Sequence, residues 1–144
     1  WSLWHERTFA EWILSGLEHK KELTMFEDVI FNPLRVNELV RILQILAKNE
    51  DRGILHLAGP EVLSKYEFAV KMANCFGCSG ASIKRIRLAD KKLAAPRPRN
   101  TSLNIDALTK ILGQAPEGVS EGLLQWKKAR EDGYVEKLRA WRKL

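Results

Sequence analysis

The chain has 144 residues, of which 45% are hydrophobic and 29% are charged, and it carries a formal net charge of +6. This length and composition fit one globular domain with a buried core, and they exclude a low-complexity chain. No apolar run approaches the ~20 residues that span a bilayer, and no basic-then-apolar leader opens the sequence, so we expect a cytoplasmic protein with no membrane partner.

The first part of the sequence predicts two amphipathic helices separated by a short strand. Apolar residues at positions i, i+3, i+4 and i+8 indicate a helix over about His5–His19. The segment Leu23–Phe26 is a candidate strand, and Pro33 opens a second helix that ends at the polar loop Asn49–Gly53.

The apolar segment Ile54–Ala58 comes next and is closed by a Gly-Pro breaker. A continuous apolar run of this length is typical of a strand buried on both faces of a parallel sheet. We expect His56, within it, to be a hydrogen-bonded core residue rather than a general base. Such a strand needs neighbours that this chain does not evidently supply, and the sequence starts at Trp1 rather than Met. We therefore expect residues 1–144 to be a single domain cut from a longer protein.

The alternation of helices and strands continues in the second part. Ser64 and Glu67 have the spacing of a capping box, which starts a helix that Gly77 ends. A basic strand is expected over Ile83–Leu88, and a loop stiffened by two prolines over Ala89–Ser102.

Two further helices complete the predicted elements. Asn104 is the expected cap of a short helix that closes at Gly113, and the chain is helical from Ser120 with a break near Gly133. The order helix, strand, helix, strand, helix, strand, helix predicts an α/β fold with few strands and flanking helices.

The basic residues gather in the segment Lys84–Arg99. It holds seven of them against one acid, Asp90, so its net charge equals that of the whole chain. The seven are Lys84, Arg85, Arg87, Lys91, Lys92, Arg97 and Arg99. Such a stretch suits a phosphate-bearing partner, and it equally suits a solvated edge strand whose lysines discourage edge pairing.

Cys75 and Cys78 form a C-x-x-C pair. A redox pair places its first thiol at a helix N-terminus, where the dipole stabilises the thiolate, whereas Cys75 falls in the last turn of a predicted helix. A structural zinc needs four ligands, and the histidines offer no second pair. We therefore expect neither redox chemistry nor a metal site here.

No catalytic constellation is visible in the sequence. It contains no G-x-S-x-G, H-E-x-x-H, Walker A or G-x-G-x-x-G motif. Asp28 follows a predicted strand, but a single carboxylate without a partner is weak evidence for a catalytic site. We expect a chain that binds a ligand and has no catalytic, cofactor-binding or metal-binding residues of its own.

Four stretches, in order, resemble the C-terminal half of extended short-chain dehydrogenase/reductases, and the dTDP-4-dehydrorhamnose reductase branch in particular. They are Thr8-Phe9; Phe26–Asp28 with Asn32–Leu39; Gly53–Pro60 with Leu63–Ala69; and Ala94–Leu103 with Leu112-Gly113. The third and fourth are the most specific of the set.

This resemblance implies the C-terminal portion of an extended Rossmann-type reductase, whose separate N-terminal Rossmann half binds NADPH or NADH. In such enzymes hydride passes to the 4-keto carbon of a nucleotide sugar, and a Y-x-x-x-K pair supplies the proton. That pair is missing here, because Tyr66 is followed at the fourth position by Val70 and Tyr134 by Leu138. The chain alone is therefore expected to bind a nucleotide sugar and no cofactor, with the absent Rossmann half as its partner.

The resemblance also implies a substrate site. Arg97, in an R-P-x-N stretch, resembles the arginine that relatives aim at the pyrophosphate, and a planar guanidinium can engage two phosphate oxygens at once. Arg99 and Asn100 are secondary candidates. Thr8 and Phe9 match the start of the helix that faces the sugar nucleotide.

Other interpretations remain open. Phe31 stands where many family members place a further phosphate-binding arginine, which departs from the usual diphosphate site. A non-catalytic regulatory module, as in the methionine adenosyltransferase regulatory subunit, is similar to the same branch. Nucleic-acid binding through the basic segment and the basic C-terminal helix is less expected, because that helix also carries acids and no recognised motif is present. Trp1 and Trp4, with any uncovered sheet edge, predict self-association.

Overall fold

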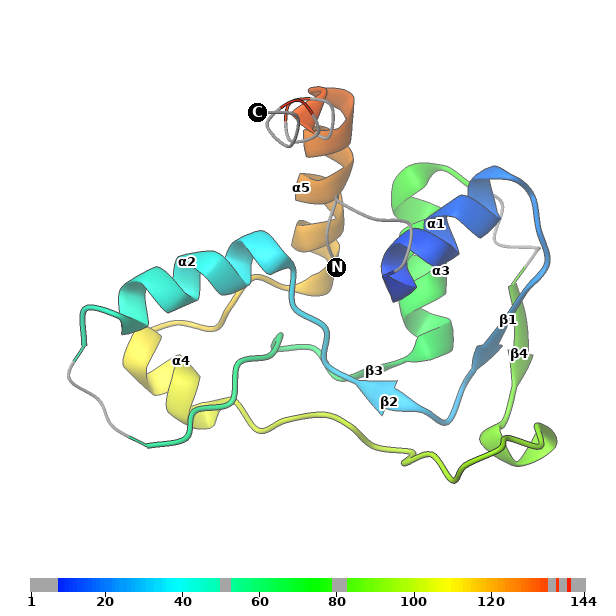
Figure 1. Cartoon of the computed structure of the whole chain (residues 1–144), viewed down its shortest axis with the longest axis horizontal. Coiled ribbons are helices and arrows are strands. Elements are labelled where there is room, and N and C mark those ends of the chain that lie inside the picture. Colours follow the sequence, from blue (N-terminus) through cyan, green and yellow to red (C-terminus); the bar gives the residue numbers. More distant parts are fainter. Residues whose placement is uncertain (1–7, 50–52, 79–82, 135–136, 138–139, 141–144) are drawn as a thin grey trace.

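The structure is a computed structural model of the chain, and it describes residues 8–49, 53–78, 83–134, 137 and 140. Its helices and strands alternate as an α/β fold, which confirms the predicted class (Figure 1). The elements are α1 (Phe9–Glu18), β1 (Leu23–Phe26), β2 (Ile30–Phe31), α2 (Val36–Leu46), β3 (Leu63–Ser64), α3 (Lys65–Phe76), β4 (Ile83–Ile86), α4 (Asp106–Leu112) and α5 (Val119–Glu131), with a 3-10 turn at Leu88–Asp90.

The strands form two small sheets within the described residues. Strand β1 pairs in parallel with β4, with Leu23 opposite Ile83 and Phe26 opposite Ile86. Parallel strands need a crossover, and α3 serves as one, because it packs against both β1 and β4. The second sheet joins β2 and β3 antiparallel, with Phe31 opposite Leu63.

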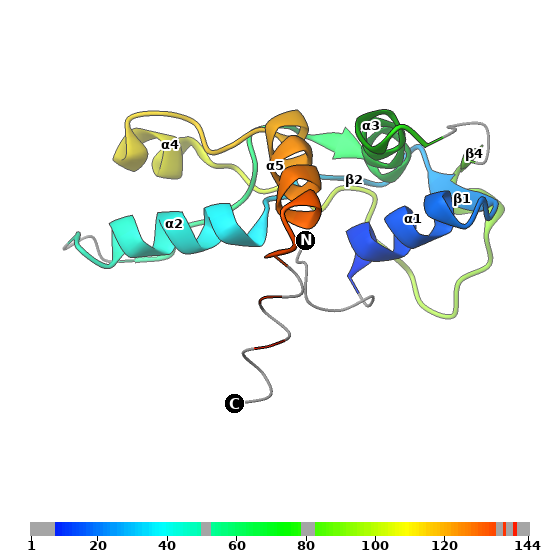
Figure 2. The ribbon, with the colours of Figure 1, turned by 90° about the horizontal axis from the view of Figure 1, so that it is seen from above.

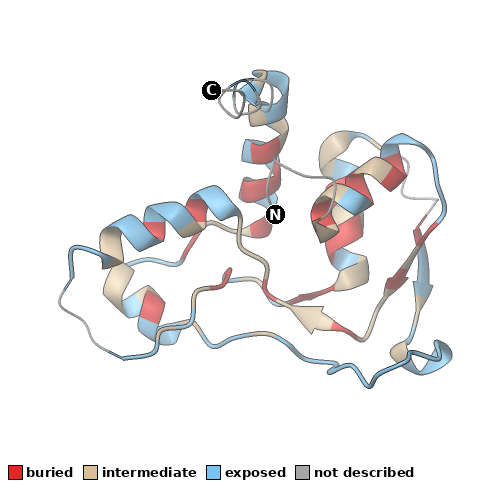
Figure 3. Cartoon of the chain, viewed as in Figure 1, coloured by how far each residue is buried: buried red, intermediate tan, exposed pale blue. Residues whose placement is uncertain are grey.

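The core lies where α3 meets α1, α5 and the β1–β4 pair (Figure 3). Its largest fully buried side chains include Ile13, Met25, Phe68, Met72 and Leu123. Burying one such side chain stabilises the folded state by about 1.5–3 kcal/mol, so this end of the molecule carries most of the hydrophobic stabilisation. Helices α2 and α4 lie at the opposite end, away from β1 and β4 (Figures 1 and 2).

The predicted helix boundaries around α3 are confirmed. The Ser64 hydroxyl accepts a hydrogen bond from the Glu67 backbone N–H at 3.1 Å, and the Glu67 carboxylate accepts one from the Ser64 N–H at 2.7 Å. Gly77 ends the helix with φ 68°. Gly113 closes α4 with φ 70°, and α5 ends just before Gly133, where a break was predicted.

The prediction of a buried strand over Ile54–Ala58 is wrong. The segment is irregular, and Ile54 is 95% exposed, although Ala58 is buried. His56 is exposed as well, so the expected core histidine is also wrong. A strand is buried on both faces only where neighbouring strands and helices cover it, and among the described residues none pairs with this segment.

Smaller differences have local causes. Helix α2 begins at Val36 rather than Pro33, because Arg35 still has an extended backbone. Asn104 lies one residue before the cap of α4, where its side-chain oxygen accepts a hydrogen bond from the Asp106 N–H at 2.9 Å. Strand β4 stops at Ile86, because the Leu88 N–H donates to the Asp28 carboxylate at 2.8 Å instead of to a strand.

Part of the sequence prediction lies outside the described residues. The start of the first predicted helix, before Thr8, belongs to this part, as do Trp1 and Trp4. Among the residues that are described, no helix is both long and apolar enough to cross a membrane.

Candidate functional site

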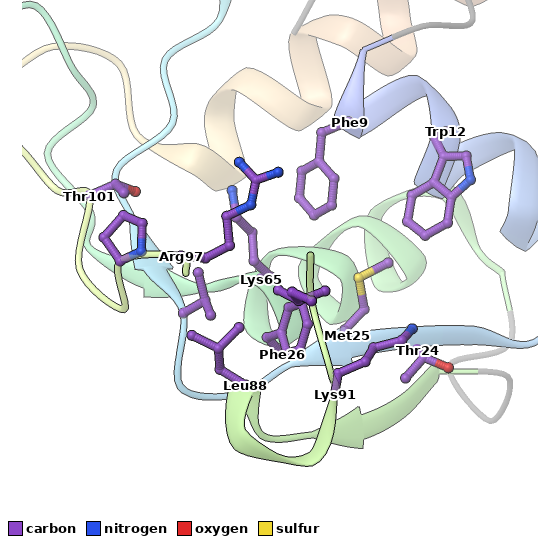
Figure 4. Close-up of a pocket in the computed structure, with 13 residues that line it drawn as sticks. Phe9, Trp12, Thr24, Met25, Phe26, Lys65, Leu88, Lys91, Arg97 and Thr101 are labelled. Carbon is purple, nitrogen blue, oxygen red and sulfur yellow. The ribbon is translucent and has the colours of Figure 1, made fainter. Parts of the chain in front are cut away.

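A cavity of about 600 Å³ opens between α1, β1, the start of α3 and the loop that follows β4 (Figure 4). This volume lies within the range of small-molecule sites. The cavity is lined by Phe9, Trp12, Thr24, Met25, Phe26, Val29, Lys65, Leu88, Lys91, Leu93, Arg97, Pro98 and Thr101. Its walls are therefore mostly apolar and aromatic, with three cations and no carboxylate among these lining residues.

Helix α1 brings two aromatic rings to the cavity. The Thr8 hydroxyl accepts a hydrogen bond from the Glu11 N–H at 3.3 Å, and the Glu11 carboxylate accepts one from the Thr8 N–H at 3.1 Å. This capping box fixes where the helix begins. Phe9 and Trp12, three residues apart, then lie on one face of the first turn with stacked rings whose centroids are 6.2 Å apart.

The loop that carries Arg97 is tied to β2 by hydrogen bonds. The Ile30 N–H donates to the Arg99 carbonyl at 2.7 Å, and the Thr101 N–H donates to the Ile30 carbonyl at 3.0 Å. The buried Asn32 side chain donates to the Leu103 carbonyl at 2.9 Å and accepts from the Leu103 N–H at 2.9 Å. These bonds hold the loop across the cavity, so Arg97 points into it (Figure 4).

The basic segment is less free than its sequence indicates, because four of its seven cations are paired with carboxylates. The pairs are Lys84–Glu22, Arg85–Glu27, Arg87–Glu27 and Arg99–Asp28. Within the described residues, Lys91, Lys92 and Arg97 have no such partner, and two of these three line the cavity. Unpaired positive charge is thus concentrated at the cavity rather than spread along the strand.

Lys65 adds a third cation from the first turn of α3. Its ammonium nitrogen lies 3.4 Å from the centroid of the Phe31 ring and 4.6 Å from that of Phe9. Burial lowers the pKa of this ammonium, because a desolvated charge is less stable than a hydrated one. The attraction of the two ring faces favours the charged form and opposes that shift.

The structure brings together two of the five predicted site residues, Phe9 and Arg97. Thr8 caps α1 and lines a neighbouring cavity of about 360 Å³ together with Phe9. The side chain of Arg99 is 67% exposed and lies 3.8 Å from the Asp28 carboxylate. Asn100 accepts hydrogen bonds from the N–H and hydroxyl of Ser102, which shapes the loop.

Lys65 and Trp12 also line the cavity and were not predicted as site residues, and Lys91 was predicted only as a member of the basic segment. One signal for Lys65 was present, because a cation in the first turn of a helix is disfavoured by the helix dipole. A residue that breaks a local preference without an evident local reason is a functional candidate.

The cysteines carry no sign of redox chemistry. Both are free thiols, and Cys75 lies in the last turn of α3. Burial raises the pKa of the Cys75 thiol, so its thiolate is disfavoured. Across the part of the chain that the structure describes, no three His, Cys, Asp or Glu side chains lie close enough together to hold a metal ion.

The α/β fold thus carries a cavity with three cations and aromatic walls, a lining that is complementary in charge and shape to an anion that also carries a ring. Comparisons with known proteins show to which family the chain belongs. The family model described as the RmlD substrate binding domain matches residues 3–130, and the chain belongs to this family. The resemblance read from the sequence is thereby confirmed. No curated protein sequence gives a significant match to the chain.

Solved structures share the fold of the chain. A dTDP-4-dehydrorhamnose reductase from Clostridium acetobutylicum matches with a TM-score of 0.76 and 18% identity, over 87% of this chain and 44% of that one. A dTDP-4-dehydrorhamnose reductase from Bacillus anthracis, solved with NADP, matches with a TM-score of 0.73 and 20% identity, over 84% of this chain and 43% of that one. A third, from Yersinia enterocolitica, matches with a TM-score of 0.70 and 18% identity, over 83% of this chain and 42% of that one. The chain thus spans less than half the length of these proteins, and none of the three is a regulatory subunit.

Proposed function

We propose that this chain is the nucleotide-sugar-binding part of an NADPH- or NADH-dependent oxidoreductase of the dTDP-4-dehydrorhamnose reductase type. One observation carries the proposal: a cavity in which Arg97 and Lys65 extend cations beside the Phe9 ring, with no carboxylate in its lining. A diphosphate matches the cations, and a base or sugar ring matches the apolar wall. The neighbours named as dTDP-sugar reductases support this substrate class.

The candidate residues take different roles in this proposal. Arg97 binds the diphosphate, because its planar fork can donate two parallel hydrogen bonds to phosphate oxygens. Phe9 offers a ring face to the ligand. Thr8 and Asn100 hold the helix start and the loop in place, and Arg99 is a secondary phosphate ligand at the rim.

The redox step is assigned to a separate N-terminal Rossmann half. The sequence has no G-x-G-x-x-G loop and no Y-x-x-x-K pair, so its residues do not fit a nicotinamide dinucleotide or supply the proton donor. The NADP bound to the Bacillus anthracis reductase supports nicotinamide chemistry in the complete enzyme. There the cofactor supplies hydride, and this chain orients the sugar by holding its diphosphate.

The end of the molecule formed by α2 and the segment 53–58 is the surface on which that half would dock. Val36, Val40 and Leu43 of α2 are 38%, 48% and 48% exposed, and Ile54 is almost fully exposed. Val36, Val40 and Leu43 recur at i, i+4 and i+7, so they lie along one face of α2, and exposed apolar residues on one face mark an interaction surface. Without its partner the chain is expected to self-associate through this surface. Sedimentation should show oligomers for the chain alone and fewer for Val40→Glu, whereas a clean monomer for the unmodified chain would count against this assignment.

Isothermal titration of the chain with dTDP tests the substrate site. The variant Arg97→Ala should weaken binding about ten- to hundredfold, because a charged hydrogen bond to phosphate contributes about 1.5–3 kcal/mol. Lys92→Ala is the matched control, since it removes one unpaired positive charge from the same loop but does not line the cavity. Equal affinities for Arg97→Ala and the unmodified chain would remove Arg97 from the site.

A further inference from the structure

The backbone of Lys65 is held rigidly at the edge of the cavity. It follows Ser64, the buried cap of α3, and its own N–H donates to the Val29 carbonyl at 3.0 Å. Val29 also lines the cavity. The direction in which the lysine side chain leaves the backbone is therefore set by hydrogen bonds on both sides of it.

Two phenylalanine rings fix the position of the ammonium group. Lys65 Nζ lies over the faces of Phe31 and Phe9, whose centroids are 6.1 Å apart at an interplanar angle of 78°. Phe31 packs edge-on against Phe68, with 5.5 Å between centroids, and Phe68 is fully buried in the core. The lysine thus rests on rings that are themselves held by the core, and the attraction between a cation and ring faces keeps it there.

No carboxylate neutralises this lysine in the described part of the chain. Lys71 and Lys84, by comparison, each lie within 3 Å of a glutamate oxygen. A half-buried cation without a counter-ion attracts an incoming anion strongly, because little water competes for it. Arg97 enters the same cavity on the side of Phe9 (Figure 4).

We propose that Lys65 is the second phosphate-binding cation of this cavity, and that Lys65 and Arg97 together select a nucleoside diphosphate over a monophosphate. The inference rests on the proposed function and adds to it the residue that recognises the second phosphate. Phe31 is a positioning residue in this site, since it touches Lys65 rather than the ligand.

Titration of the full chain with dTDP, dTMP and thymidine tests this inference. Lys65→Met keeps the aliphatic stem and removes the charge, so it should weaken dTDP binding about tenfold or more and remove most of the preference for dTDP over dTMP. Lys65→Arg keeps the charge and should restore much of that preference. Phe31→Leu keeps an apolar side chain but removes the ring, so it should reduce the preference by a smaller factor. Lys92→Met is the matched control and should bind both nucleotides as the unmodified chain does.

The outcomes separate the two proposals. If Arg97→Ala weakens dTDP binding while Lys65→Met leaves the preference for dTDP intact, the substrate site stands and the role of Lys65 is wrong. If Lys65→Met and Lys92→Met weaken binding equally, the effect comes from general charge, and the inference is again wrong. If the unmodified chain binds no dTDP at all, both proposals fail together.

Discussion

The two ends of the molecule differ in how completely they bury their apolar residues. At the end formed by α1, α3, α5 and the β1–β4 pair, the inner side chains are almost fully buried and the candidate site rests directly on them. At the end formed by α2, α4 and the segment 53–58, Ile42 and Leu108 are buried, but Ile54 and Leu43 face outward. The first end, called the complete end below, therefore has a closed core, although Trp12 and Leu124 are exposed on its surface. The second, called the incomplete end, has few buried side chains beneath its exposed ones.

The largest expected effect is at the complete end. Phe68→Ala should lower the free energy of unfolding by about 3–5 kcal/mol, because it removes a fully buried ring and leaves a cavity under Phe9 and Phe31. Urea unfolding followed by circular dichroism measures this change. Leu43→Ala at the other end is the control, and it should change the stability by less than about 0.5 kcal/mol. Comparable losses in the two variants would abolish the distinction between the ends.

An intermediate effect on the free energy of unfolding is expected where the two ends of the molecule are joined. Asn32→Ala removes three hydrogen bonds, one to the buried Gly59 carbonyl and two to the backbone of Leu103, and leaves these backbone groups without that partner. It should cost about 2–3 kcal/mol of stability, and it should also weaken dTDP binding, because the loop that carries Arg97 keeps its bonds to Ile30 but loses those to Asn32. Paired unfolding and titration measurements check both effects. Loss of stability with unchanged affinity would show that the loop holds its shape without Asn32.

A smaller, pH-dependent effect is expected at the incomplete end. Glu38 accepts two hydrogen bonds from Arg41 and one from the Glu117 N–H, and chiefly the bonds from Arg41 hold the pKa of its carboxyl below the ordinary value of 4.5. A lowered folded-state pKa stabilises the protein above about pH 4.5, and this stabilisation is lost as the pH falls through the folded-state value. Glu38→Gln should therefore be less stable at pH 7 and should lose less stability between pH 5 and pH 3.

Unfolding curves across that pH range provide the measurement, with the exposed Glu121→Gln as the control. A Glu38→Gln variant whose stability falls with pH as steeply as that of the unmodified chain would contradict the assigned role of Glu38.

Local chemistry explains which parts of the fold were predictable from the sequence. The caps at Ser64, Gly77 and Gly113 depend on residues within one turn, so their spacing alone located the helix ends. The segment Ile54–Ala58 failed because burial of a strand depends on what covers it, and the described chain places no strand beside it.

Contacts between residues far apart in the sequence explain which parts of the site could not be predicted. Arg97 is predicted from its motif, and the structure places it in the lining of the cavity. Lys65 was missed because its contacts are with Phe31 and Phe9, more than thirty residues earlier in the sequence. The ion pairs of the basic segment could not be predicted, because its glutamate and aspartate partners lie some sixty residues earlier in the sequence. Long-range pairing of this kind leaves no local pattern.

A crystal structure of the chain with dTDP would show directly whether the cavity is the nucleotide site. We expect the nucleotide in the cavity beside Phe9, with its two phosphates within hydrogen-bonding distance of the Arg97 guanidinium and the Lys65 ammonium. Nucleotide bound elsewhere, or bound in the cavity with its phosphates turned away from both cations, would overturn the proposed site.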